Sequence, residues 1–433
     1  MKRHVRLIAA GAVGNAIEFY DFLIFGYLSL HIGRAFFPAG DGVAAILASL
    51  AAFAVGMLMR PLGGLIFGLL ADRGNRLRAL VASAAMIAVP TFLIGLLPGY
   101  ATIGVFAPII LVLLRVIQGL SLGGEFPASL AYLVENAPPG RRALFGSFAS
   151  AGAVSGMLLG TATCYVTSSL LAEDAMQEWG WRIPFLLSAV LTIAAVLLRR
   201  ALLRDDHAPV RASLPMATLL RENLRGLVGV FSANILTGTA SFVVFMFTVP
   251  WLMQTAGMAY DDALAINLHT LLLLFMALPV AGLLADRFGH RRTVMLGVAG
   301  LLLGAHPLLA MMRSGDPLLD SLGEAGLALA FALLVASMGP IMADAFPSHA
   351  RVTGIAIAYG SAVGIFGGLS PMMVQYLMGE AHDVMAPAHV VMGASLISGV
   401  SLLLASQWQA RGAEAPQAAR PDLAQSARAH GAV

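Results

Sequence analysis

Five charged side chains lie inside long apolar segments of this 433-residue sequence: Glu18, Asp21, Arg60, Arg115 and Glu125. A charge at the centre of a lipid bilayer costs at least ~2.5–3.5 kcal/mol on insertion scales, so each needs a partner or a function. All five fall in the first third of the chain. The apolar segments of the second half contain no charge at comparable depth, only the titratable His269 and His306.

The two acids of the first apolar segment have a spacing that suits proton exchange. Asn15, Glu18 and Asp21 follow one another at intervals of three, so they share one face of a helix. A carboxylate that is desolvated in one conformation and hydrated in another can bind and release a proton. Glu125 is a further candidate for proton coupling. The alternative is a set of fixed ion pairs with Arg60 or Arg115 that only hold helices together.

The two intramembrane arginines could bind an anion. Arg60 lies about twelve residues, or about 18 Å of helix, before Asp72, which places it near the middle of a membrane. A planar guanidinium can hold a carboxylate through two hydrogen bonds. Gln118 follows Arg115 by three residues, and its amide can donate to or accept from hydroxyl and carboxyl oxygens. Balancing the acids of the first segment is the alternative role for Arg60.

Composition indicates the elements that must position these residues. The chain is 59% hydrophobic and 11% charged, with a mean hydropathy of +0.84, whereas a soluble domain has about 25% charged residues. Apolar runs of about 20 residues, each long enough to cross a ~30 Å hydrocarbon core, recur along the chain. We expect an all-α membrane protein with twelve spans, near 7–30, 43–70, 79–97, 105–135, 143–170, 183–203, 224–252, 263–285, 293–312, 323–344, 352–378 and 388–408.

Charges near the ends of these spans orient the chain. With the N-terminus inside, only Arg34, Arg182 and Arg313 of the 26 Lys and Arg residues fall in outside segments, besides Arg60 and Arg115 within spans. Basic residues collect in cytoplasmic loops, so both termini are predicted to be cytoplasmic. We interpret clustered charges at the inner ends of spans as a cytoplasmic gate, formed by Asp72, Arg73, Arg76, Asp286, Arg287 and Arg291.

The sequence repeats itself. Residues 68–73, Gly-Leu-Leu-Ala-Asp-Arg, recur at 282–287, an offset of 214, and four glycines of the fifth span recur in the eleventh at an offset of 208. Two parallel six-span halves explain both matches, although the glycines also suit close helix packing. We expect an N-terminal six-helix bundle at 1–203, a cytoplasmic linker at 204–225, a C-terminal six-helix bundle at 226–410 and a disordered cytoplasmic tail at 411–433.

Six short motifs, spread over nearly the whole chain, form a specific combination. They are residues 14–22 (Gly-Asn-Ala-Ile-Glu-Phe-Tyr-Asp-Phe), 60–64 followed by 72–73, 115–125, 179–185 (Trp-Gly-Trp-Arg-Ile-Pro-Phe), 346–351 and 366–371. The combination resembles the metabolite:proton symporter family of the major facilitator superfamily. That resemblance implies a twelve-helix fold in two pseudo-symmetric halves, alternating access, and proton-coupled uptake of a small polar metabolite.

The resemblance extends the candidate substrate site. Arg182 is similar to an arginine that looks important for uptake in related organic-acid carriers, but an interface anchor beside Trp179 and Trp181 explains it equally well. The second half contributes neutral candidates, although a lone histidine in an apolar span is more often a packing residue. The substrate-binding candidates are Asn15, Tyr20, Arg60, Arg115, Gln118, Arg182, Asn234, His269 and Tyr359.

These patterns predict a secondary transporter that imports a small organic anion with protons, a di- or tricarboxylate such as citrate. The rival substrate is a zwitterion such as proline or betaine, whose sites rely more on aromatic cages. A membrane-embedded enzyme or sensor is the remote alternative, because the sequence has no metal-ligand cluster and no nucleophile–base spacing. The lone Cys164 excludes a disulfide framework and a cysteine-based metal cluster.

The expected partners follow from this interpretation. They are protons, the organic acid and the lipid bilayer of a bacterial inner membrane, with no cofactor, no metal and no nucleic acid. We expect a monomeric functional unit.

Overall fold

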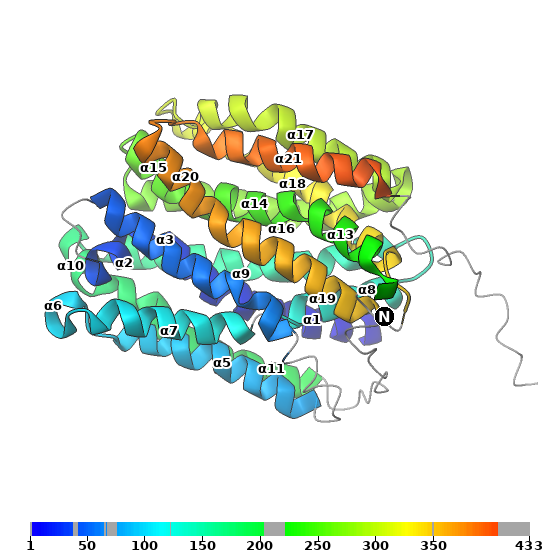
Figure 1. Cartoon of the computed structure of the whole chain (residues 1–433), viewed down its shortest axis with the longest axis horizontal. Coiled ribbons are helices and arrows are strands. Elements are labelled where there is room, and N and C mark those ends of the chain that lie inside the picture. Colours follow the sequence, from blue (N-terminus) through cyan, green and yellow to red (C-terminus); the bar gives the residue numbers. More distant parts are fainter. Residues whose placement is uncertain are drawn as a thin grey trace, which may run out of the picture.

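The computed structural model describes residues 2–37, 42–64, 66, 76–121, 123–202, 221–348 and 350–405, and the regular structure in these ranges is helical throughout. The long helices run side by side in one bundle (Figure 1). Most of the predicted linker and the whole of the predicted tail at 411–433 lie outside the described residues.

Six predicted spans account for the helices of the first half, with short helices between some of them. These helices lie mainly in the lower part of Figure 1. They are α1 (Lys2–Tyr27), α2 (Ser29–Phe36), α3 (Gly42–Leu58), α5 (Arg76–Leu96), α6 (Tyr100–Ile103), α7 (Phe106–Ser121), α8 (Glu125–Glu135), α9 (Arg142–Leu170), α10 (Glu173–Glu178), a 3₁₀ turn (Gly180–Arg182) and α11 (Ile183–Leu202).

The second half contains the other six spans, two of which are interrupted by a π-helical turn. Its elements are α13 (Leu224–Ala233), α14 (Ile235–Phe242), the π-helix η2 (Val243–Phe247), α15 (Thr248–Thr255), α16 (Tyr260–Phe288), α17 (His290–Met311), α18 (Pro317–Asp344), α19 (Arg351–Ala362), the π-helix η3 (Val363–Gly367), α20 (Gly368–Glu380) and α21 (Ala386–Leu403). The π-turns fall in the seventh and eleventh spans.

The prediction of a twelve-helix membrane protein is confirmed. Within the described ranges, nine helical stretches are long and apolar enough to cross a membrane when consecutive helices such as α7 and α8 are joined. Helices α1, α5 and α11 occupy the sequence positions of the other three predicted spans.

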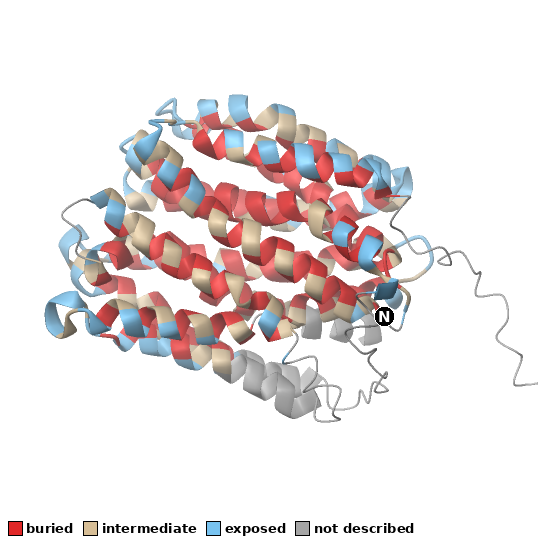
Figure 2. Ribbon diagram, in the orientation of Figure 1, coloured by how far each residue is buried: buried red, intermediate tan, exposed pale blue. Residues whose placement is uncertain are grey.

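Large apolar side chains cover the outer surface of the bundle, as contact with lipid requires. Leu303 on α17 is 75% exposed, and Phe106, Ile193 and Leu296 are each more than 60% exposed. Figure 2 shows exposed positions along the outer helices of the bundle and buried positions where helices face one another. Polar residues are therefore concentrated inside the bundle, where they can form a transport site.

Glycines let helices α3 and α7 touch backbone to backbone. A Cβ atom on Gly63 would lie 1.9 Å from the carbonyl oxygen of Leu120, and one on Gly119 would lie 1.9 Å from the carbonyl oxygen of Gly56. Small residues allow this approach between membrane helices. Arg60 lies between these two contact points, so the crossing fixes the depth of its side chain.

We expect Gly63→Ala to destabilise the protein, because its new methyl group would meet backbone that cannot rotate away. Overpacking of this kind costs about 1–3 kcal/mol, and the melting temperature of the detergent-purified protein should fall by several degrees. Gly393→Ala is the matched control, since a Cβ there on α21 meets nothing within 4 Å. Equal melting temperatures for the two variants would contradict the crossing.

Candidate functional site

In the first half, a buried ion pair joins α1 to the helical turn that continues α3 within the stretch Gly42–Gly64. Arg60 Nη2 donates to Glu18 Oε1 at 2.7 Å, and both side chains are 3% exposed. The Nε atom of Arg60 has no hydrogen-bond partner. Glu125, the first residue of α8, interacts electrostatically with Glu18. One guanidinium is therefore paired with one carboxylate inside the bundle, and a second carboxylate lies near enough to act on the first.

A second polar network lies entirely within the first half. Ser188 donates to Asp21, which also interacts electrostatically with Arg115. Arg115 Nη1 donates to Gln118 Oε1 at 2.9 Å, and Gln118 donates in turn to Thr91. The Arg115 guanidinium is fully buried and lies over three rings, those of Phe22, Phe25 and Phe53. This network ties α1, α5, α7 and α11 together and does not face the second half.

A small cavity of about 40 Å³ lies between the two halves. Its polar lining is neutral and comes from Ser150, Asn234, Thr237, Ser241 and Tyr359, and its aromatic lining comes from Phe19, Phe126, Phe242, Phe331 and Tyr359. Asn234 Oδ1 and Thr237 Oγ1 are buried without a hydrogen-bond partner. A cavity of this size has room for a few water molecules. It must expand before an organic substrate can enter.

Tyr359 connects this cavity to the ion pair. Its ring stacks on Phe126 with centroids 4.9 Å apart, and its hydroxyl interacts electrostatically with both Arg60 and Glu18. A Cβ on Gly364, in η3 of the second half, would lie 3.7 Å from the Cβ of Arg60. The Glu18–Arg60 pair therefore lies at the boundary between the halves, behind an aromatic layer.

Three polar contacts between the halves close one end of the bundle, which we call the Asp286 end. The Asp286 carboxylate accepts from the backbone N–H groups of Ala143 and Leu144, both at 2.9 Å, at the N-terminus of α9. The other two contacts are ion pairs, Arg142 with Asp344 at 2.7 Å and Arg351 with Glu135 at 2.6 Å. A carboxylate at a helix N-terminus is favoured by the free N–H groups and the helix dipole.

Neutral hydrogen bonds close the opposite end, which we call the Tyr260 end. Tyr27 donates to the carbonyl of Phe245 at 3.0 Å, and Tyr260 donates to the carbonyl of Tyr27 at 3.2 Å. Thr161 of α9 donates to Asn267 of α16 at 3.2 Å. Among the described residues the halves thus touch at both ends of the bundle, and the cavity lies between these two sets of contacts.

Besides Arg115 and Gln118, which belong to the first-half network, four more predicted substrate-binding residues lie away from the cavity. Asn15 donates to Ser129 and to the carbonyl of Ala149, and Tyr20 donates to the carbonyl of Pro184, all in the first half. Arg182 donates to the carbonyls of Gly95 and Leu97 at the end of α5, and its guanidinium lies 4.4 Å from the Trp181 ring centroid. His269 is exposed on the outer side of α16. Of the second-half candidates, Asn234 and Tyr359 line the cavity.

The predicted gate residues divide into three groups. Asp286 joins the halves, whereas Arg287 and Arg291 are exposed on the second half, where Arg291 donates to the carbonyl of Leu403. Asp72, Arg73 and the side chain of Arg76 lie outside the described residues.

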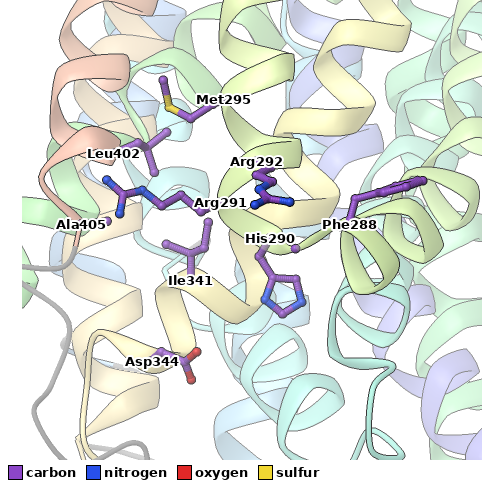
Figure 3. A pocket seen from close by; sticks show the side chains of 10 residues that line it. Phe288, His290, Arg291, Arg292, Met295, Ile341, Asp344, Leu402 and Ala405 are labelled. Atoms are coloured by element: carbon purple, nitrogen blue, oxygen red, sulfur yellow. The ribbon is translucent and has the colours of Figure 1, made fainter.

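Figure 3 shows Arg291 and Arg292 in a pocket of about 630 Å³ between α17, α18 and α21. This pocket belongs to the second half alone and is separate from the transport cavity.

The expectation of a second half without buried charge is wrong at α18. Glu324 and Asp320 are both 0% exposed. The predicted span began at residue 323, which placed Glu324 at a membrane boundary, but α18 begins at Pro317 and carries Glu324 two turns into the helix. An acid within the predicted tenth span was the sequence signal for this residue. Thr237 and Ser150 had no such signal, because single hydroxyl residues are common in membrane helices.

No cluster of three or more His, Cys, Asp or Glu side chains that could hold a metal ion occurs in the part of the chain that the structure describes. The interactions that the described polar side chains form are ion pairs and hydrogen bonds.

Spanning helices, a cavity between two halves and a gate at each end define a membrane transporter. The sequence profile of the Major Facilitator Superfamily matches residues 15–371, and the chain belongs to this family of transporters. It is 31% identical to the proline/betaine transporter of Salmonella typhimurium, covering 92% of this chain and 83% of that one. It is 31% identical to the citrate-proton symporter of Klebsiella pneumoniae, covering 87% and 86% of the two chains.

The fold is also similar to that of a solved transporter. The structure of the proton:xylose symporter XylE bound to 6-bromo-6-deoxy-D-glucose superposes with a TM-score of 0.73 at 16% identity, covering 94% of this chain and 96% of that one. This likeness supports the twelve-helix architecture.

We expect Asp286→Asn to open the Asp286 end more often. The substitution removes the charge from two hydrogen bonds, each worth about 1.5–3 kcal/mol when charged. Spin labels placed across this end should show a larger open population by pulsed electron resonance. Arg287→Ala is the control, since Arg287 is exposed and contacts Phe288 of its own half. An unchanged distance distribution in Asp286→Asn would refute the gating role.

Proposed function

We propose that this transporter imports a small organic anion together with protons, and that the substrate is a di- or tricarboxylate such as citrate. The observation that carries the proposal is the buried Glu18–Arg60 pair beside the cavity. The likeness to a citrate-proton symporter over most of both chains supports the same substrate class.

The ion pair supplies a coupling mechanism. When Glu18 binds a proton, Arg60 loses its carboxylate partner and becomes a buried cation without compensation, which is costly. A substrate carboxylate can then take the place of Glu18 on the planar guanidinium. When Glu18 releases its proton again, it competes for Arg60 and displaces the substrate. Binding of the proton and binding of the anion therefore favour one another.

The energetics suit the import of an anion. An inside-negative membrane potential opposes anion entry, by about 2.3 kcal/mol per charge per 100 mV. Protons that outnumber the substrate's negative charges make the transported complex positive, so the same potential then drives uptake. Glu18, Asp21 and Glu125 are the first-half acids proposed for proton coupling, and Asp21 acts through its network with Ser188 and Arg115.

Neutral groups of the second half would complete the substrate site. Asn234 and Thr237 each keep one buried oxygen without a partner, and Tyr359 reaches both the cavity and the ion pair. These groups can bond the hydroxyl or second carboxyl of a hydroxy acid. Arg115 and Gln118 would position α1 and α3, because Phe22, Phe25 and Phe53 separate the Arg115 guanidinium from the other half.

The Asp286 end would face the cytoplasm of a bacterial inner-membrane protein with both termini inside. Basic residues of the described chain, including Arg142, Arg291 and Arg351, gather at this end, as the positive-inside rule requires. The Tyr260 end would then be the external gate. The transport cavity and both gates lie within one chain, which supports a monomeric functional unit.

A zwitterionic compatible solute such as proline or betaine is the second candidate substrate. Five aromatic rings line the cavity, and such rings attract quaternary ammonium groups. The likeness to a proline/betaine transporter extends over 92% of this chain and therefore supports this substrate class as well. In this alternative, Arg60 would hold the single carboxylate and the rings would hold the cationic end.

A panel of labelled substrates separates these candidates. Proteoliposomes given an inward proton gradient should accumulate citrate or ketoglutarate above equilibrium, and they should lose this accumulation when a protonophore is added. Shikimate, proline and betaine complete the panel. Accumulation of proline or betaine without any organic acid would overturn the carboxylate proposal and favour the zwitterion.

Arg60→Lys keeps the charge but removes the two-pronged geometry, so uptake should fall by about tenfold or more, mainly through a raised KM.

Glu18→Gln should retain exchange of labelled for unlabelled substrate but lose accumulation driven by the proton gradient. A double variant, Glu18→Gln with Arg60→Met, removes both charges and tests whether the pair is needed for folding. Arg313→Ala is the exposed control. Full uptake by Arg60→Ala would exclude Arg60 as the anion site.

A further inference from the structure

Glu324 is a buried acid that the ion-pair mechanism does not use. Its side chain is 0% exposed, and Oε1 accepts from Asn267 Nδ2 at 2.9 Å. Oε2 has no hydrogen-bond partner, and Thr270 lies beside the carboxyl on the same face of α16. No Lys, Arg or His among the described residues forms a salt bridge with it. An ionised carboxylate with one neutral donor and no cation would be very costly in this place.

The neighbours of Glu324 are the residues that close the Tyr260 end. Asn267, which holds Glu324, also accepts from Thr161 of the first half and donates to the carbonyl of Phe245 at 3.1 Å. That carbonyl is the acceptor of Tyr27, again from the first half. One asparagine therefore connects the acid of α18 to two of the three hydrogen bonds that cross between the halves at this end, those of Thr161 and Tyr27.

The titratable groups around Glu324 are few. Tyr27 of α1 interacts with it electrostatically, and Cys164 of α9 and Tyr260 of α16 lie against Tyr27 and against each other. From α17, the atoms packed on this turn of α18 belong to Leu308 and Met312. On α18 itself, Asp320 accepts from Ser314, which precedes the helix. Glu324 is thus the acid whose charge would act directly on the closing contacts.

We propose that Glu324 is a second proton-binding site, and that the Tyr260 end closes only when this carboxyl carries a proton. A neutral carboxyl can be buried against Asn267 as observed. Ionised Glu324 would require water, and water reaches it when α9 and α16 part and the gate opens. The proposal rests on the proton-coupled function proposed above and adds a proton requirement to the gate itself.

This arrangement would link protonation to the direction of movement. If the Tyr260 end is external, Glu324 takes its proton from outside, and only the protonated carrier can close that gate and proceed toward the inside. The Glu18–Arg60 pair then governs substrate binding, while Glu324 governs closure. The two sites lie in different halves, so proton binding would act on both sides of the cavity.

The chain carries its own reporter for a test. Cys164, its single cysteine, is 0% exposed and lies on α9 against Tyr260, so a small neutral thiol reagent should reach it only when the Tyr260 end opens. This measurement needs no substrate, so it can fail or succeed independently of the proposed substrate and of the Glu18–Arg60 mechanism.

The experiment compares Cys164 labelling rates of the full-length wild type and Glu324→Gln at several pH values. The ratio of the two rates removes the intrinsic pH dependence of the thiol. Glutamine imitates the protonated acid, so the wild-type to variant ratio should rise from near one at about pH 5 to about tenfold at about pH 9. Glu324→Asp retains a carboxyl. Its Cys164 labelling rate divided by that of Glu324→Gln should therefore also rise with pH, which guards against a merely misfolded variant.

Asp320→Asn is the matched control, because Asp320 is a buried acid one turn away from Glu324. Its Cys164 labelling rate divided by that of the wild type should stay near one at every pH. In proteoliposomes, Glu324→Gln should retain substrate exchange and lose proton-driven accumulation. The proposal would be overturned if the ratio of wild-type to Glu324→Gln labelling rates stayed flat across the pH range, and the ratio of Glu324→Asp to Glu324→Gln stayed equally flat.

Discussion

The constraint on which this structure depends is the cost of placing charge and hydrogen-bonding groups where water cannot reach them. In a lipid-embedded bundle the backbone polar groups must find partners inside the protein, and a buried charge needs a counter-charge or hydrogen bonds. The Glu18–Arg60 pair meets this requirement at 2.7 Å, with Arg60 fixed in depth by the glycine crossing of α3 and α7. The same cost makes the pair useful, because any event that neutralises one partner strongly destabilises the other.

The two gates use different chemistry, and the difference follows from their neighbours. At the Asp286 end, ion pairs and a carboxylate on a helix N-terminus hold the halves together where side chains are partly exposed. Water can screen and replace such contacts, so each exposed pair is worth little alone. At the Tyr260 end the contacts are neutral and more deeply buried. Breaking these neutral hydrogen bonds exposes no charged side chain among their own members. The acid that would meet water there is Glu324, which accepts a hydrogen bond from Asn267.

Much of the architecture was predictable because membrane spans leave strong signals. Apolar runs, loop charges and the internal repeat predicted twelve helices, and the charges at 18 and 60 could be recognised as costly without knowing their partner. Which of them meet was not predictable. Arg60 and Arg115 looked equivalent in sequence, yet one lies at the boundary between the halves and the other lies over three phenylalanine rings within one half. Side-chain direction on crossing helices decides this, and sequence spacing alone does not report it.

Glu324 was overlooked for a related reason, since a span boundary misplaced by a few residues turns a buried acid into an apparent surface one. Its true environment changes how the two halves are understood. The first half contains cations that stabilise its acids, whereas Glu324 has only neutral partners in the second. An acid with a cationic partner can stay ionised when buried, but an acid without one is buried at low cost only as the neutral form. The halves therefore share a helical plan but differ in the partners of their buried acids, and under the proposed role of Glu324 this asymmetry would give the closed state a preference for protons.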